Sequence, residues 1–227
     1  MANVAIIMGK SGTGKSTSIK TLNPDETVII SVLDKRLPFK GSAKMYNAEK
    51  KNFFLLDKYA DIISYLKGIS DKLQNVKNVI LDDSMYTMRK EFFNRINEKG
   101  YEIYKELAAH FQQIIATCEK MRGDINVFLI LHIEPVFNGA MIETYKIATI
   151  GKLIDDKFNP VELVSVALMS DIRYDNDGKP EYGFYTHANM NSDGIKIPCK
   201  SPEGMFEEDF IPNDLQLVVD KMNEYYE

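Results

Sequence analysis

The chain has 227 residues, of which 44% are hydrophobic, so it can bury the core of one large α/β domain. Its formal net charge of −5 argues against broad, non-specific attraction to polyanions, because phosphate contacts need clustered lysine and arginine side chains. No apolar run approaches the ~20 residues that span a bilayer, and the first residues lack the pattern of a secretory signal. We therefore expect a cytoplasmic protein without a membrane partner.

The first part of the chain alternates between short apolar runs and segments with helical periodicity. The runs are rich in β-branched residues, which is typical of strands buried on both faces of a parallel sheet. They lie at residues 4–8, 27–33, 79–81 and 125–131. Helices fit the segments between them, at residues 16–22, 57–74 and 103–121. This order predicts an α/β fold with a mostly parallel sheet flanked by helices.

The later part of the chain has a different pattern. We expect two strands, at residues 161–174 and 182–189. The turn-rich segment 175–178 joins them, as in a β-hairpin. A final helix fits residues 212–226, because its apolar side chains recur at helical spacing. We expect one domain over residues 1–227, with a core at 1–134 and a β-rich extension with a C-terminal helix at 135–227.

A glycine-rich segment directly follows the first apolar run. Residues 9–16 read GKSGTGKS and match the phosphate-binding pattern G-x-x-x-x-G-K-[ST] in full. Glycines let the backbone wrap closely around phosphate oxygens, and successive N–H groups at a helix start form an anion site. Lys15 is expected to reach the β- and γ-phosphates, and Ser16 to ligate Mg²⁺. We therefore expect ATP and Mg²⁺ as cofactors, in a nucleotide-binding core at 1–134 with contacts from Gly9, Lys10, Ser11, Gly12, Thr13, Gly14, Lys15, Ser16 and Thr17.

Two adjacent carboxylates close the third apolar run. Asp82 and Asp83 follow Val-Ile-Leu, which places them at the carboxyl edge of the predicted sheet, where ligands of open α/β sheets bind. Asp82 is the candidate magnesium ligand, and Asp83 the candidate for polarising the attacking water. The two roles could be exchanged, because one register step decides which side chain faces the site.

Two further strand-end residues are candidates for catalysis. Asp34 ends the second run and competes with Asp83 for the water-activating role; the alternative is an exposed turn acid. His132 closes the fourth run, where it could sense the γ-phosphate by hydrogen bonding or be only a structural histidine.

Several longer stretches then suggest a family. They are GKSGTGKST at residue 9, DKRLPFKG at 34–41, VILDDSMYTM at 79–88, FLILHIEP at 128–135, TIGKLIDDK at 149–157 and KSPEGMFEEDFIPNDL at 200–215. In this combination and order the chain resembles the RecA-core ATP-binding proteins encoded by bacteriophages, some of which act as single-strand annealing recombinases. The resemblance runs from Gly9 through Pro212.

The resemblance implies a RecA-like sheet, ATP hydrolysis, and work on single-stranded DNA in recombination or strand annealing. It implies a homo-oligomer with ATP at the subunit interface, in the cytoplasm of a host bacterium, with a single-strand-binding protein as a further partner. It also points to Lys146 and Lys152, since lysines of that region can reach a neighbouring subunit's γ-phosphate in RecA-type assemblies. Two solvated surface lysines are the alternative.

Two other functions remain open from the residues alone. A nucleotide or nucleoside kinase suits the chain length and the phosphate-binding loop, but the arginines are scattered where kinases usually cluster them over the transferred phosphate. A non-hydrolysing ATP-binding assembly module is the third reading, against which the Asp82–Asp83 pair argues.

Overall fold

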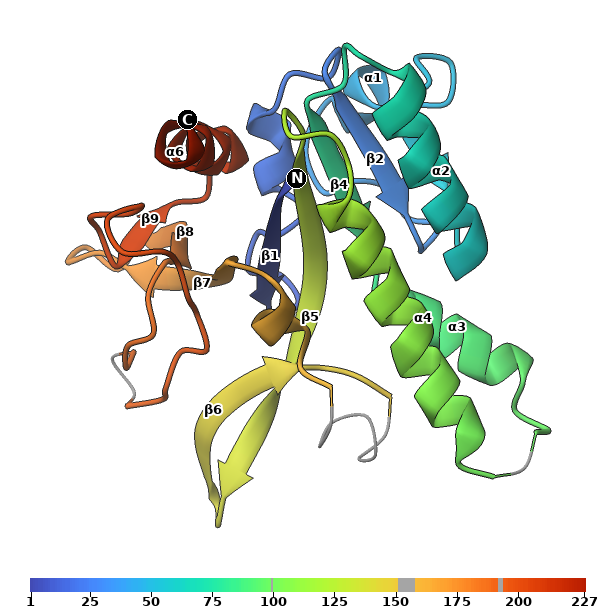
Figure 1. Cartoon of the computed structure of the whole chain (residues 1–227). Helices are drawn as coiled ribbons and strands as arrows, with labels where there is room; N and C mark the ends of the chain where they lie inside the picture. Colours follow the sequence, from blue (N-terminus) through green and yellow to red (C-terminus); the bar gives the residue numbers. More distant parts are fainter. Residues whose placement is uncertain (99, 151–157, 192–193) are drawn as a thin grey trace.

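One sheet runs through the computed structural model, which describes residues 1–98, 100–150, 158–191 and 194–227 (Figure 1). In the described chain its strands are β1 (Asn3–Gly9), β2 (Thr27–Ser31), β3 (Phe53–Leu55), β4 (Asn78–Asp82), β5 (Asn126–Asn138), β6 (Met141–Ile147), β7 (Val166–Tyr174), β8 (Pro180–Tyr185) and β9 (Phe210–Pro212). Their spatial order is β3-β2-β4-β5-β1-β7-β8-β9, and β6 pairs with β5 off this path.

In this spatial order, each strand of the run β3-β2-β4-β5-β1-β7 is parallel to its neighbours in that run, and β8 and β9 continue the sheet antiparallel. In this register Gly9 lies between His132 on β5 and Ser170 on β7. Asp82 on β4 lies beside Ser31 on β2. The ends of β1, β2, β4 and β5 therefore meet at one edge. Because β7 pairs with β1, the later part of the chain belongs to the same sheet as the core.

Helices cover both faces of the sheet. The face toward α2 (Tyr59–Lys72), α3 (Tyr86–Asn94) and α4 (Glu102–Glu119) buries Val4, Ile6 and Met8 of β1. The opposite face carries α1 (Ser42–Met45), the 3-10 helix η1 (Ser18–Thr21) and α6 (Leu215–Tyr226), and buries Ala5 and Ile7 (Figure 1). Because alternate side chains enter opposite cores, the first strand must be apolar throughout, which explains its unbroken run.

The predicted α/β class with a mostly parallel sheet, a C-terminal β-hairpin and a final helix is confirmed. The helix expected at 16–22 is instead a run of turns that ends in the four-residue η1. There the hydroxyls of Ser18 and Thr21 donate to the carbonyls of Lys15 and Ser18, at 2.6 and 3.0 Å. Such local side-chain bonds compete with an α-helical backbone.

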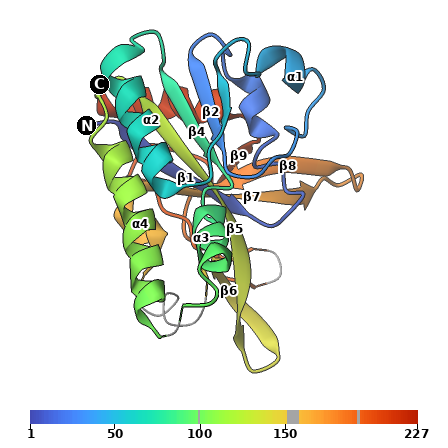
Figure 2. The same cartoon turned by 90° about the vertical axis from the view of Figure 1, so that its right-hand side faces the viewer.

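Strand β5 is much longer than the expected fourth strand, and its second half forms an arm with β6. Figure 2 shows this hairpin projecting beyond the carboxyl edge of the sheet. Phe137 and Met141 near its tip are 60% and 75% exposed. Sequence periodicity missed β6, because its polar side chains stand on both faces of a ribbon that leaves the core.

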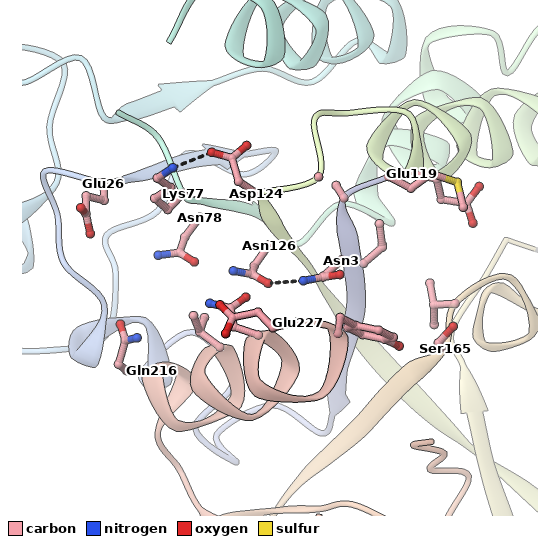
Figure 3. A pocket seen from close by; sticks show the side chains of 18 of the residues that line it. Asn3, Glu26, Lys77, Asn78, Glu119, Asp124, Asn126, Ser165, Gln216 and Glu227 are labelled. Carbon is pink, nitrogen blue, oxygen red and sulfur yellow. Dashed lines mark hydrogen bonds and ion pairs between the residues drawn. The ribbon is translucent and has the colours of Figure 1, made fainter. Parts of the chain in front are cut away.

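The amino edge of the sheet carries a row of asparagines. Asn3, Asn126 and Asn78 lie in register on neighbouring strands, and Asn3 Nδ2 donates to Asn126 Oδ1 at 3.1 Å. They face a cleft of about 1050 Å³ beside α6 (Figure 3). The Asn3–Asn126 bond pairs two of these amides where the strands begin, whereas Asn78 Oδ1 is buried without a hydrogen-bond partner in the described chain.

Among the described residues, no helix is long and apolar enough to span a bilayer. Cys118 and Cys199 are both buried free thiols, and burial raises the pKa of each.

Two glycine substitutions test the sheet and helix assignments. A Cβ at Gly183 would overlap the Ile211 carbonyl and the Phe210 ring, so Gly183→Ala should lower the free energy of unfolding by ~1–3 kcal/mol through loss of β8–β9 packing.

Gly68 lies inside α2 with open space around its Cα, so Gly68→Ala should raise the free energy of unfolding by ~0.5–1 kcal/mol. Denaturant unfolding measures both, and a destabilised Gly68→Ala variant would contradict the assignment of α2.

Candidate active site

The glycine-rich loop leaves β1 at the carboxyl edge and is held there by β7. Ser170 and Thr13 share a hydrogen bond of 2.6 Å between their hydroxyls, and Thr13 Oγ1 also donates to the Lys10 carbonyl at 2.9 Å. A Cβ at Gly9 would overlap the Ser170 hydroxyl, so only glycine lets β1 and β7 approach this closely. The loop therefore has a defined shape before any ligand arrives.

Lys15 folds back over its own loop. Its Nζ donates to the carbonyls of Gly9 and Lys10, at 2.9 and 2.6 Å, and the residue is only 5% exposed. Burial lowers the pKa of Lys15 to about 8, although the negative charge of Asp83 acts in the opposite direction. A buried ammonium with only neutral acceptors favours an incoming anion, as a phosphate group supplies.

Asp82 and Ser16 form the part of the site that suits a metal ion. Ser16 Oγ donates to Asp82 Oδ1 at 2.8 Å, and Asp82 is fully buried. Asp82 Oδ2 is buried without a hydrogen-bond partner among the residues that the structure describes. Burial, together with the negative charge of Asp83, raises the pKa of Asp82. A divalent cation would offset this cost.

Mg²⁺ fits this pair of oxygen ligands. It is usually held by one or two protein oxygens together with water and nucleotide phosphates. The described chain contains no group of three His, Cys, Asp or Glu side chains that could hold a metal ion. When bound, Mg²⁺ neutralises charge on the phosphate oxygens.

Asp83 is held by two cationic or polar partners from other strands. His132 Nε2 on β5 lies 3.1 Å from Asp83 Oδ1, and Lys35, after β2, forms an ion pair with Asp83 Oδ2. Burial raises the pKa of Asp83, but the His132 and Lys35 contacts outweigh it, and the pKa lies below its ordinary value. Asp83 adopts a φ of 56°, a left-handed conformation that aspartate and asparagine tolerate better than most residues.

These groups line one cleft of about 760 Å³, within the usual size range of a small-ligand site. The predicted residues in its lining are Ser11, Gly12, Gly14, Lys15, Ser16, Thr17, Asp83 and His132. Gly9, Thr13 and Asp82 lie behind this lining, through the contacts described above. Lys10 points elsewhere, with its Nζ 4.6 Å from the centre of the Tyr145 ring.

The cleft also contains residues that the sequence did not single out, namely Lys20, Lys35, Pro38, Tyr182 and Asn213. Lys35 follows directly after Asp34, the predicted rival of Asp83. Asp34 itself is exposed and is not part of the cleft lining. Only the strand order, in which β2 lies next to β4, shows that Lys35 can reach Asp83.

Only one of the two lysines expected to act across a subunit interface is among the residues that the structure describes. Lys146 on β6 pairs with Glu134 at 3.3 Å on the projecting arm. Lys152 lies outside the residues that the structure describes. Their role stays a prediction.

The arrangement can bind a polyphosphate and orient water against it. The loop and Lys15 supply anion contacts, and Ser16 with Asp82 supplies oxygen ligands for a cation. Asp83 has a lowered pKa, so it is ionised at neutral pH and is able to accept a hydrogen bond from a water molecule. His132, which already contacts Asp83, links this carboxylate to the end of the neighbouring strand.

Comparison with known families agrees with this chemistry. Residues 1–179 match a family model described as an AAA domain, which covers more than half of the chain and all of the loop, Asp82, Asp83 and His132. No curated protein shows significant sequence similarity to the chain.

Asp83→Asn tests the water-orienting role. Asparagine tolerates the left-handed backbone, so we expect a folded variant that binds ATP within about threefold of wild type. Turnover should fall roughly 10²- to 10⁴-fold, because the amide no longer offers a carboxylate acceptor. Single-turnover hydrolysis measures this. Asp34→Asn is the matched control, and a larger loss in that variant would transfer the role to Asp34.

The lowered pKa of Lys15 predicts a pH dependence of ATP binding. In the protein without a ligand, the Lys15 ammonium loses its proton near pH 8, whereas a bound phosphate would keep it protonated. Affinity should therefore be constant below pH 8 and fall by roughly tenfold per pH unit above it. Equilibrium binding between pH 7 and 9.5 measures this.

Lys15→Arg is the control, since its guanidinium stays charged and should remove the dependence. A wild-type affinity that stays flat up to pH 9.5 would contradict the assignment.

Proposed function

Because the chain belongs to the AAA domain family of P-loop ATPases, we propose that it hydrolyses ATP as an oligomer and so controls its binding to single-stranded DNA. The process would be DNA recombination or strand annealing in a bacteriophage-infected cell. The observation that carries hydrolysis is Asp83, held by His132 and Lys35 beside the Ser16–Asp82 pair. A passive nucleotide-binding module would have little need for a second buried carboxylate at this point.

Five of the six stretches that resemble phage recombination ATPases contribute to the cleft, and most of the other, 149–157, lies outside the described residues. Lys35 and Pro38 come from 34–41, Asp83 from 79–88, and His132 from 128–135; the last stretch, 200–215, contributes Asn213. Residues far apart in the chain thus contribute to one site, which supports reading the resemblance as a shared ATP-dependent mechanism.

An oligomer with ATP at its interface is compatible with the shape of the site. The Lys35 side chain is 40% exposed and Tyr182 is 46% exposed, so the cleft is open along one side. A neighbouring subunit could supply further cations to the γ-phosphate there, and Lys152 is the candidate from the family resemblance.

Binding of single-stranded DNA would depend more on stacking than on phosphate contacts. The net charge of −5 gives no broad basic surface, whereas Phe137 at the tip of the β5–β6 arm is an exposed aromatic ring. Bases stack on such rings without sequence preference. A single-strand-binding protein is the further partner that this function would involve.

The arginines argue against phosphoryl transfer to a second nucleotide. None lines the cleft in the described chain. Arg89 lies over the Tyr86 ring, which itself packs against His132, and the other arginines with a described contact are engaged with acidic or aromatic side chains. Arg95 pairs with Glu91, Glu98 and Glu106, Arg122 with Asp124, and Arg173 stacks on the Tyr185 and Phe210 rings.

Hydrolysis of ATP with and without single-stranded DNA tests the proposal. We expect turnover that rises several-fold with single-stranded DNA, that rises less with the duplex of the same sequence, and that disappears in Lys15→Ala. A rate indifferent to DNA would remove the recombination role and leave the ATPase. Transfer of phosphate to a nucleoside monophosphate instead of water would replace it with a kinase.

A further inference from the structure

The phosphate-binding cleft extends past the loop onto the later part of the chain. Tyr182 of β8 and Asn213, between β9 and α6, both line it. They are neighbours, because the Asn213 backbone N–H donates to the Tyr182 carbonyl at 3.1 Å. No role in phosphate binding, metal binding or water orientation has been assigned to Tyr182 or Asn213.

The strand order shows which residues lie at each end of the cleft. Asp83 directly follows β4 and His132 lies on β5, on one side of β1 and its loop. Tyr182 lies on β8, two strands to the other side of β1. A nucleotide whose terminal phosphate faces Asp83 would therefore place its nucleoside toward Tyr182 and Asn213.

The Tyr182 ring is available to a ligand. It is 46% exposed, and no ring or cation contact to it occurs among the described residues. Tyr185 on the same strand differs, since its ring packs 5.0 Å from Phe210 and under Arg173. An aromatic ring left open at the wall of a nucleotide cleft provides a stacking face for a base.

Asn213 brings an unsatisfied donor to the same place. Its Nδ2 is buried and has no hydrogen-bond partner in the described chain, and a Cβ at Gly14 would lie only 2.9 Å from that atom. The segment is firmly anchored, because Leu215 N–H donates to Thr21 Oγ1 at 3.1 Å and Asp214 caps α6. A buried amide donor without an acceptor costs free energy, which a ligand acceptor would recover.

We propose that Tyr182 and Asn213 form the nucleoside subsite: the Tyr182 ring stacks on the base, and Asn213 Nδ2 donates a hydrogen bond to the nucleoside. This rests on the proposed function, since it takes the loop as an ATP site. It assigns to the β8–β9 segment a direct part in ligand binding.

The test compares ATP with inorganic tripolyphosphate, each with Mg²⁺, by titration calorimetry. Tripolyphosphate fills the phosphate part of the cleft but has no nucleoside. Tyr182→Ala should weaken ATP binding roughly 5- to 100-fold and leave tripolyphosphate binding unchanged. Asn213→Ala should weaken ATP binding by a smaller factor, again without effect on tripolyphosphate.

Two controls separate stacking from folding. Tyr182→Phe keeps the ring and should bind ATP within about twofold of wild type. Tyr174→Ala removes a tyrosine that is 70% exposed on the same hairpin but does not line the cleft, and it should change neither affinity.

The outcomes distinguish failure of the ATP site from failure of the nucleoside subsite alone. If wild type binds neither ATP nor tripolyphosphate, the proposed function fails and the subsite fails with it. If wild type binds both with equal affinity, or Tyr182→Ala weakens both equally or neither, the phosphate site stands and the nucleoside subsite is overturned.

Discussion

Four charged side chains gather at the carboxyl edge of the sheet, and much of the structure serves to keep them there. Asp83 is neutralised by Lys35 and supported by His132. Lys15 has only carbonyl acceptors, and Asp82 only the Ser16 hydroxyl. Buried charges without counter-charges are costly. A magnesium–polyphosphate complex would supply an anion to Lys15 and a cation to Asp82, so the ligand completes an electrostatic balance that the free protein leaves open.

This balance explains why the ends of so many strands are polar. Lys35 and Asp83 follow β2 and β4, and His132 lies on β5 level with the end of β1. They reach the same point only because these strands are neighbours. Strand β5 lies between β1 and β4, which places His132 between the loop and the two acids. The apolar interiors of the strands fix this register, and the register in turn aligns the polar ends.

The parts of the site that could be predicted are those whose chemistry is local in the chain. The loop from Gly9 to Ser16 is a contiguous pattern, and Asp82 and Asp83 are marked by the apolar run before them. Lys35, Ser170 and Tyr182 could not be identified in this way, because their positions depend on which strands are neighbours. Sequence periodicity shows that a strand exists but says little about its partner.

The same limit applies to the fold. The strands of the core were evident because both of their faces are buried, which makes them uniformly apolar. Three strands were missed: β3 and β9 have only three residues each, and β6 carries polar side chains on both faces. The 3-10 helix η1 deviates from the expectation because the hydroxyls of Ser18 and Thr21 bond to nearby carbonyls.

The pairing of β1 with β7 has a consequence for how the protein is made. Thr13 and Ser170, which clamp the loop, are separated by 157 positions in sequence, and Asn3 pairs with Asn126 across 123. Contacts of such long range form slowly, because the chain between them must first be brought together. On the ribosome, β1 therefore gains its neighbours only after β5 and β7 have emerged. The loop can be clamped, and so become competent to bind, only once Ser170 has left the ribosome.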